Sequence, residues 1–158
     1  MSVVESGPIH FPWPPVFYVA AILASVLLSW WLPLPWIGEP LDGMFFVAGI
    51  VLAIAAVAMV IMAIHTMHKA KTSIRLDRPA AHLVQNGPYA MSRNPIYLGN
   101  TLFMIGLGLA AGMLWFIILA IVAAFLTQKL AIEYEEPHLE QRFGKKYRDY
   151  CKRVRRWI

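Results

Sequence analysis

The sequence predicts an all-α integral membrane protein with about four transmembrane helices and a C-terminal amphipathic cytoplasmic helix. Of the 158 residues, 59% are hydrophobic and 15% are charged, against about 45–50% and about 25% in average soluble domains. Several uncharged stretches are long enough to cross a bilayer as a helix, which needs about 20 apolar residues. All 14 Lys and Arg fall in two blocks, residues 69–93 and 129–158. We expect a single domain over residues 1–158.

The first two predicted spans are residues 16–32 and 43–65. The first is uncharged and ends at Pro33 and Pro35, because proline stops a helix. No basic segment precedes it, so we expect a retained span and not a cleaved secretory signal.

The last two predicted spans form a hairpin. Residues 94–128 contain no charged side chain, and as one helix they would be about 52 Å long, more than one bilayer crossing needs. We therefore predict two helices, 95–111 and 114–132, with a break near Gly112. Gly108 and Gly112 have the spacing of a small-residue pair suited to close helix packing, although ordinary membrane-helix glycines explain them equally well.

The charge distribution predicts the orientation. Four spans place both termini on one side, and the positive-inside bias assigns the loop 66–94 and the C-terminal tail to the cytoplasm. We thus expect a multi-pass protein whose polar ligands bind at the cytoplasmic face. Tryptophans near the predicted span ends are typical of interfacial anchors. They are Trp30, Trp31, Trp36 and Trp115.

Residues 133–158 have the pattern of one amphipathic helix, with Pro137 in its first turn. Apolar residues recur at steps of three and four. They are Leu139, Phe143, Tyr147, Tyr150 and Val154. Extending this stripe backward reaches Glu135, which should face the protein or the headgroup boundary while Glu136 faces water. A carboxylate on an apolar face needs a hydrogen-bonding partner or a ligand, so Glu135 is the candidate acid.

A second polar cluster runs from His82 to Tyr97. Gly87-Pro88 indicates a turn and Asn94-Pro95 the start of a helix. The tyrosines, Arg93 and the helix-start amides suit an anionic or zwitterionic ligand with an aromatic part. A membrane-interface loop with tyrosine anchors and one positive-inside arginine has the same composition, and residue types alone favour it.

Metal, disulfide and nucleic-acid chemistry are not expected. The single cysteine, Cys151, excludes a disulfide framework or a cysteine-rich metal site. His65 and His68 could share a helix face, but no third ligand lies nearby in the sequence. The basic residues flank apolar runs, so membrane lipids are the expected partners and nucleic acid is not.

Short motifs occur in a fixed order on either side of the predicted hairpin. Before it stand Gly87-Pro-Tyr89, Arg93-Asn-Pro95 and Tyr97-x-Gly99. After it stand Glu135-Glu136-x-x-Leu139, Phe143-Gly144-x-x-Tyr147-x-x-Tyr150 and Val154-x-Arg156. In this order they resemble the isoprenylcysteine carboxyl methyltransferase and phospholipid methyltransferase superfamily, over roughly residues 70–158. The short chain is similar to prokaryotic members, which implies a prokaryotic cell membrane.

The resemblance implies a membrane enzyme that transfers a methyl group from S-adenosyl-L-methionine, bound at the cytoplasmic face, to a lipophilic acceptor. Carried over by position, the cofactor-binding residues are His82, Leu83, Val84, Tyr89, Arg93, Asn94, Pro95, Tyr97 and Glu135. The implied catalytic residues are Arg93, Glu135 and Glu136. The acceptor is expected to carry a carboxylate, a thiol or an amine. Phospholipid N-methylation and a non-catalytic lipid-binding protein with the same fold are the alternatives.

Three departures from the family pattern bear on the acceptor. Asn94 stands where characterised eukaryotic members have histidine, and His82 is shifted by one position. Ala131 stands where members have an arginine on the lipid-substrate side; Lys129 could replace it in part or extend to the membrane interface. A prenylcysteine acceptor therefore does not follow. An amine acceptor would need a base, for which Glu136, His82 and His138 are weak candidates.

Overall fold

The computed structural model describes residues 13–71 and 82–158, and every regular element in these residues is a helix. In chain order they are α1 (Trp13–Trp31), α2 (Asp42–Lys69), the 3₁₀ turn η1 (Gly87–Ala90), α3 (Pro95–Ala111), α4 (Leu114–Thr127), the π-helical segment η2 (Gln128–Ile132), α5 (Glu133–Phe143) and α6 (Lys145–Arg153). The predicted all-α fold class is confirmed. The segment before the first predicted span and the middle of the predicted loop 66–94 lie outside the described residues.

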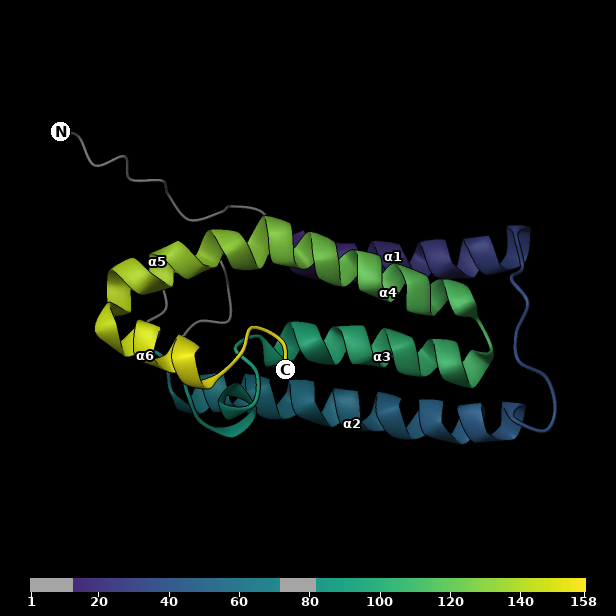
Figure 1. Cartoon of the computed structure of the whole chain (residues 1–158), viewed down its shortest axis with the longest axis horizontal. Helices are drawn as coiled ribbons and strands as arrows, with labels where there is room; N and C mark the ends of the chain where they lie inside the picture. Colours follow the sequence, from purple (N-terminus) through teal and green to yellow (C-terminus); the bar gives the residue numbers. More distant parts are fainter. Residues whose placement is uncertain (1–12, 72–81) are drawn as a thin grey trace.

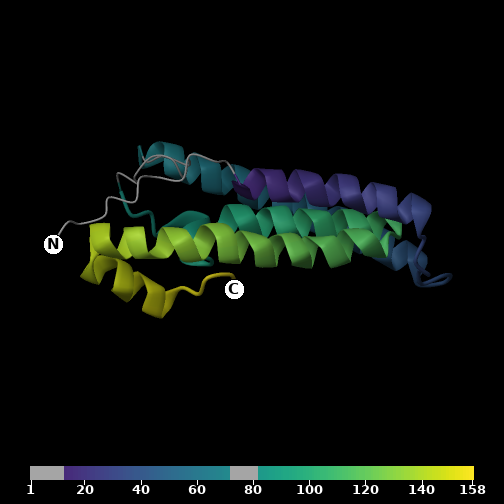
Figure 2. The same ribbon diagram turned by 90° about the horizontal axis from the view of Figure 1, so that it is seen from above.

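The four long helices are arranged as a row of neighbours. α2 packs on α3, α3 on α4, and α4 on α1, with all four axes nearly parallel in both views (Figures 1 and 2). α5 and α6 continue past one end of this row, where α6 turns back toward the start of α3 (Figure 1). This end contains most of the described charged side chains.

Glycines bring the backbones of α2 and α3 into contact. A Cβ added at Gly106 would lie 2.8 Å from the backbone N of Ala53 and 2.8 Å from the carbonyl oxygen of Gly49. A Cβ added at Gly99 would collide with the Val60 side chain of α2. Close backbone approach through small residues is the usual means of helix association in lipid, where apolar burial provides no driving force between helices.

The hairpin breaks where the sequence predicts. α3 ends at Ala111, Gly112 adopts the left-handed conformation with φ of 66°, and α4 begins at Leu114. Of the predicted small-residue pair, Gly108 does pack closely, against Phe116 within the hairpin. Gly112 instead supplies the turn, because a positive φ costs glycine little.

The prediction of one helix over residues 133–158 is wrong. α5 ends at Phe143, and Gly144, with φ of 51°, turns the chain into the separate helix α6. The predicted position of Pro137 in the first turn of a helix is also wrong. Pro137 lies inside a continuous helix that runs from α4 through η2 into α5. A π-helical turn directly precedes α5, and such turns occur mostly as single insertions within α-helices.

Three helices are long and apolar enough to cross a membrane, namely α1, α2 and the continuous helix Leu114–Phe143; α3 is a shorter apolar helix. The continuous helix has 30 residues and measures about 45 Å at about 1.5 Å per residue. A bilayer core of about 30 Å cannot contain it whole. We place the charged segment α5 outside the core, because its glutamates would be costly among lipid tails.

Candidate cofactor pocket

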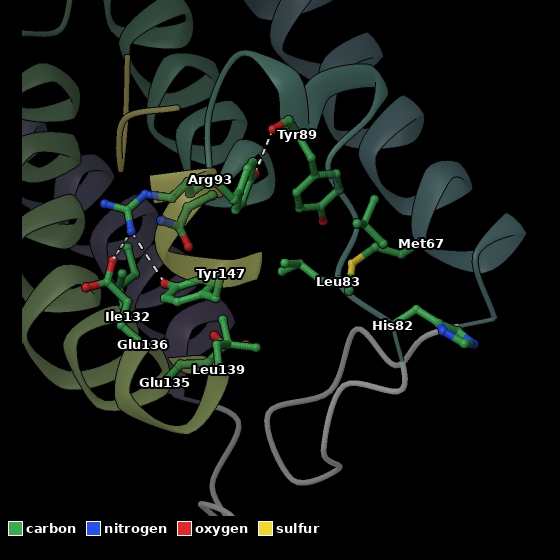
Figure 3. A pocket seen from close by; sticks show the side chains of 13 residues that line it. Met67, His82, Leu83, Tyr89, Arg93, Ile132, Glu135, Glu136, Leu139 and Tyr147 are labelled. Atoms are coloured by element: carbon green, nitrogen blue, oxygen red, sulfur yellow. Dashed lines mark hydrogen bonds and ion pairs between the residues drawn. The ribbon is translucent and has the colours of Figure 1, made fainter. Parts of the chain in front are cut away.

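A pocket that is partly open to solvent lies at the end of the helix row that continues into α5 and α6. Figure 3 shows its lining side chains, which come from α2, the segment around η1, η2, α5 and α6. They are Met67, His82, Leu83, Val84, Tyr89, Arg93, Asn94, Ile132, Glu135, Glu136, Leu139, Tyr147 and Tyr150. The structure therefore brings together two sequence clusters that are separated by the whole hairpin.

The buried tyrosines of α6 hold this helix against η1. Tyr147 and Tyr150 are almost fully buried and pack with Val154, Leu139 and Phe143. The Tyr150 hydroxyl donates a hydrogen bond of 2.6 Å to the carbonyl oxygen of Tyr89. Burial raises the pKa of Tyr150 to about 12, so its hydroxyl stays protonated and able to donate. The apolar stripe predicted from the sequence is thus a real cluster, although a turn at Gly144 assembles it.

Glu136 lines the pocket and forms ion pairs with two arginines. Arg93 Nη1 lies 3.1 Å from Glu136 Oε1, and Arg156 donates two hydrogen bonds to the same carboxylate, of 3.0 and 2.7 Å. Arg93 Nη1 also donates to the Tyr147 hydroxyl at 3.4 Å and to Cys151 Sγ at 2.8 Å; Figure 3 draws the first of these and the ion pair. The prediction that Glu136 faces water is wrong, because α6 and the residues after it fold back over this side of α5.

Of the two glutamates that line the pocket, Glu135 is the one without a partner. Within the described residues it makes no hydrogen bond or ion pair, although its side chain is only partly exposed. Burial, and secondly the neighbouring charge of Glu136, raise the pKa of Glu135 to about 7, while His138 acts to lower it. A carboxylate shifted in this way within a cleft is typical of a functional site.

Seven of the nine predicted cofactor-binding residues line the pocket, and two do not. Pro95 is fully buried as the first residue of α3. Tyr97 lies in the next part of α3, where its carbonyl oxygen accepts a hydrogen bond from the Tyr18 hydroxyl. It stays close enough to Glu135 for an electrostatic interaction. His82 lies at the edge of the pocket, away from Glu136 (Figure 3).

Lys129 forms an ion pair with Glu133 and donates to both of its carboxylate oxygens at 3.1 Å. This contact lowers the pKa of Glu133. The sequence offered two roles for Lys129, partial replacement of the family's arginine and extension to the membrane interface, and neither includes this ion pair. Ala131, two residues after Lys129, is fully buried.

Five pocket residues are missing from the sequence-based set. The sequence predicts an apolar stripe that contains Leu139, Tyr147 and Tyr150, but it does not assign them to the site. Because the same helix face also carries Glu135, the stripe itself was the signal that could have placed them in the pocket. Met67 and Ile132 gave no signal, since each is one apolar residue among many in a membrane helix.

A model of the phospholipid methyltransferase family matches residues 44–146, well over half of the chain. The chain belongs to the phospholipid methyltransferase family. No curated protein and no solved structure matches it.

Membership in the phospholipid methyltransferase family indicates methyltransferase activity on lipid-type substrates and, with the apolar helices, a membrane protein. The match runs from α2 to the start of α6 and so includes the two adjacent glutamates of the pocket, Glu135 and Glu136. The match ends before Tyr147, Tyr150 and Arg156. The contacts of these residues are therefore known from the structure and not from the family match.

Proposed function

We propose that the protein is an S-adenosyl-L-methionine-dependent methyltransferase that binds its methyl donor in the pocket and methylates a lipophilic acceptor arriving from the bilayer. One observation carries this proposal: an unpaired carboxylate, Glu135, faces a largely apolar and aromatic pocket in a member of a methyltransferase family. Methyltransferases generally use this donor. When bound, it supplies a methyl group on a positively charged sulfur.

The residues of the pocket fit such a ligand. Tyr89, Leu83 and Val84 provide apolar surface for an aromatic base. Glu135 provides a negative charge, which complements a cation.

The Arg93–Glu136 pair keeps the rest of the wall neutral. An unpaired arginine would repel a sulfonium, whereas Arg93 lies 3.1 Å from Glu136 and its charge is offset. Glu135 is then left as the charged group that distinguishes the donor from a neutral analogue. Methyl transfer itself depends mainly on alignment and on exclusion of water, which the buried tyrosines support.

Among acceptors, the family match favours a phospholipid amine over a prenylcysteine carboxylate. An amine must lose a proton, so it needs a base within reach. Of the candidates, His138 does not line the pocket and its ring bonds the Tyr134 carbonyl oxygen at 2.9 Å. Glu136 is occupied by two arginines. We also propose that the pocket faces the cytoplasm, together with both termini.

Calorimetric titration of the full chain in lipid nanodiscs with S-adenosyl-L-methionine tests donor binding. We expect Glu135→Gln to weaken binding by about tenfold or more, because a charge-assisted contact contributes about 1.5–3 kcal/mol. Glu140→Gln is the matched control, since Glu140 lies on the same helix but does not line the pocket. Equal affinity in all three proteins would refute the assignment of Glu135.

A radiolabelled methyl donor then tests the acceptor. Phosphatidylethanolamine, a prenylcysteine and a lipophilic thiol are supplied in separate nanodisc preparations. Transfer to the first supports phospholipid N-methylation, and transfer to the second a carboxyl methyltransferase. Binding of the donor without transfer to any of the three would support a non-catalytic member of the family.

A further inference from the structure

The residues after α6 form a strap, residues 154–158, that crosses from α6 to the start of α3. The backbone N of Arg93 donates to the carbonyl oxygen of Arg155 at 3.0 Å. The carbonyl oxygen of Arg156 accepts hydrogen bonds from Asn94 Nδ2 at 3.0 Å and from Ser92 Oγ at 3.3 Å. On the other side, Trp157 Nε1 donates to Gln128 Oε1 at 2.8 Å. The backbone of Arg156 is thus fixed between two elements.

The Arg156 side chain reaches Glu136 from outside the pocket. Its Nε and Nη2 atoms bind the two oxygens of Glu136 in a bidentate arrangement, at 3.0 and 2.7 Å. Its Nη1 atom lies 3.5 Å from Glu133. Arg156 lines a separate, wider hollow between α5 and α6, which shares only Arg93, Glu136 and Tyr147 with the pocket.

We infer that Arg156 is a positioning residue for the methyl donor: from behind the pocket it holds Glu136 against Arg93, which leaves Glu135 as the carboxylate free to meet the donor's positive charge. This inference rests on the proposed function. Bidentate arginine–carboxylate pairs fix orientation as well as charge, and a group held from a second side keeps its position when a ligand enters.

The charges around Glu135 give this role a measurable signature. The groups that act on it are Glu136 and His138 from α5, Tyr89 from η1 and Tyr97 from α3, and the pocket also contains Arg93, His82, Tyr147 and Tyr150. The charge of Glu136 raises the pKa of Glu135, and Arg156 offsets part of that charge. Without Arg156, the pKa of Glu135 rises further and its carboxyl becomes harder to ionise. As the pH is lowered, the variant should therefore lose donor binding at a higher pH than the wild type.

Arg155 offers a matched control. It precedes Arg156 on the same strap, carries the same charge and is exposed, and its side chain has no partner within the described residues. Donor Kd is measured for the full-length wild type, Arg156→Ala, Arg155→Ala and Arg156→Lys in nanodiscs, from about pH 5 to about pH 9. We expect Arg156→Ala to bind about tenfold more weakly at neutral pH and to shift the pH midpoint upward. Arg155→Ala should do neither, and Arg156→Lys should restore the midpoint because it restores the charge.

Three results would overturn the inference: equal effects of Arg155→Ala and Arg156→Ala, no effect of either, or weaker binding by Arg156→Ala at every pH with an unmoved midpoint, which indicates a purely structural role. Glu136→Gln serves if Arg156→Ala does not fold. It removes the like charge at nearly constant size and should move the midpoint downward; an unmoved midpoint contradicts the inference. If the wild type binds no donor, the proposed function itself fails, which separates the two outcomes.

Discussion

At the scale of single residues, the position of Glu135 costs stability. A carboxylate that is buried without a hydrogen-bonding partner is unfavourable in its charged form, and this cost raises its pKa to about 7. Proteins retain such groups where a ligand provides the missing interaction. Donor binding and stability should therefore respond to Glu135 in opposite directions.

We expect Glu135→Gln to stabilise the protein above neutral pH. The native pKa of Glu135 lies above its usual value, so the native state binds more protons than the unfolded state between about pH 4.5 and pH 7, and stability falls as pH rises through that window. The glutamine variant avoids this loss. Its gain should be about 2 kcal/mol at about pH 8 after discounting for partial exposure, and absent near pH 4. Thermal unfolding in detergent at the two pH values measures it; a destabilised variant at pH 8 would contradict the assignment.

Donor binding should release protons near neutral pH. A sulfonium close to Glu135 favours its charged form and lowers its pKa, so a carboxyl that is partly protonated in the free protein ionises on binding. Titrations in buffers of different ionisation enthalpy count the protons. S-adenosylhomocysteine is the control, because it lacks the sulfonium charge and should release fewer. The same release with both ligands would mean that Glu135 does not face the sulfur.

The sequence predicts Glu135 better than it predicts Glu136. Helical phase depends on neighbours three and four residues away, and these correctly place Glu135 on the side of the apolar stripe. The partners of Glu136 are Arg93 and Arg156, which lie far from it in the chain. They reach it only because of the tertiary turn at Gly144, which local periodicity does not contain.

At the scale of elements, the C-terminal helices show the same limit. The spacing from Leu139 to Val154 is compatible with one helix, but it is equally compatible with two helices whose apolar faces meet across a glycine turn. Gly144 was visible in the sequence, yet glycine is common enough in membrane proteins that it does not by itself indicate a break. The hairpin is easier to predict from the sequence. Residues 94–128 are too long for one bilayer crossing, and this conclusion does not depend on the contacts of individual side chains.

The glycine contact between α2 and α3 gives a prediction for an element pair. Gly106→Ala places a Cβ within 2.8 Å of backbone atoms that cannot move aside, so we expect a loss of roughly 1–3 kcal/mol, as for overpacked cores. Gly43→Ala is the matched control: it lies in the first turn of α2 with no atom within 4 Å of an added Cβ. It should leave stability unchanged or raise it by up to about 1 kcal/mol, because alanine favours a helix. Thermal unfolding in detergent compares them, and equal effects would contradict this packing.

At the scale of the whole molecule, the helix row separates two chemically different ends. The pocket, α5 and α6 lie at one end with the basic residues of the second block. The other end holds the Gly112 turn and four of the six tryptophans, namely Trp30, Trp31, Trp36 and Trp115. Trp30 and Trp31 are largely exposed, and Trp36 lies against Gly112. We expect the end with the basic residues to face the cytoplasm, because cytoplasmic segments of membrane proteins carry an excess of Lys and Arg.

This polarity predicts that the two ends of α4 and its continuation lie on opposite sides of the membrane. Cysteines at Met113, beside the turn, and at Gln141, an exposed position on α5, are introduced singly into a Cys151→Ser background. A membrane-impermeant maleimide should label position 113 only from the outside of right-side-out vesicles, and position 141 only in inside-out vesicles. The helix Leu114–Phe143 is long enough to reach from one side to the other, since its roughly 45 Å exceed the apolar core. Labelling of both positions from one side would mean that α3 and α4 do not cross as a hairpin, and would remove the membrane-side route proposed for the acceptor.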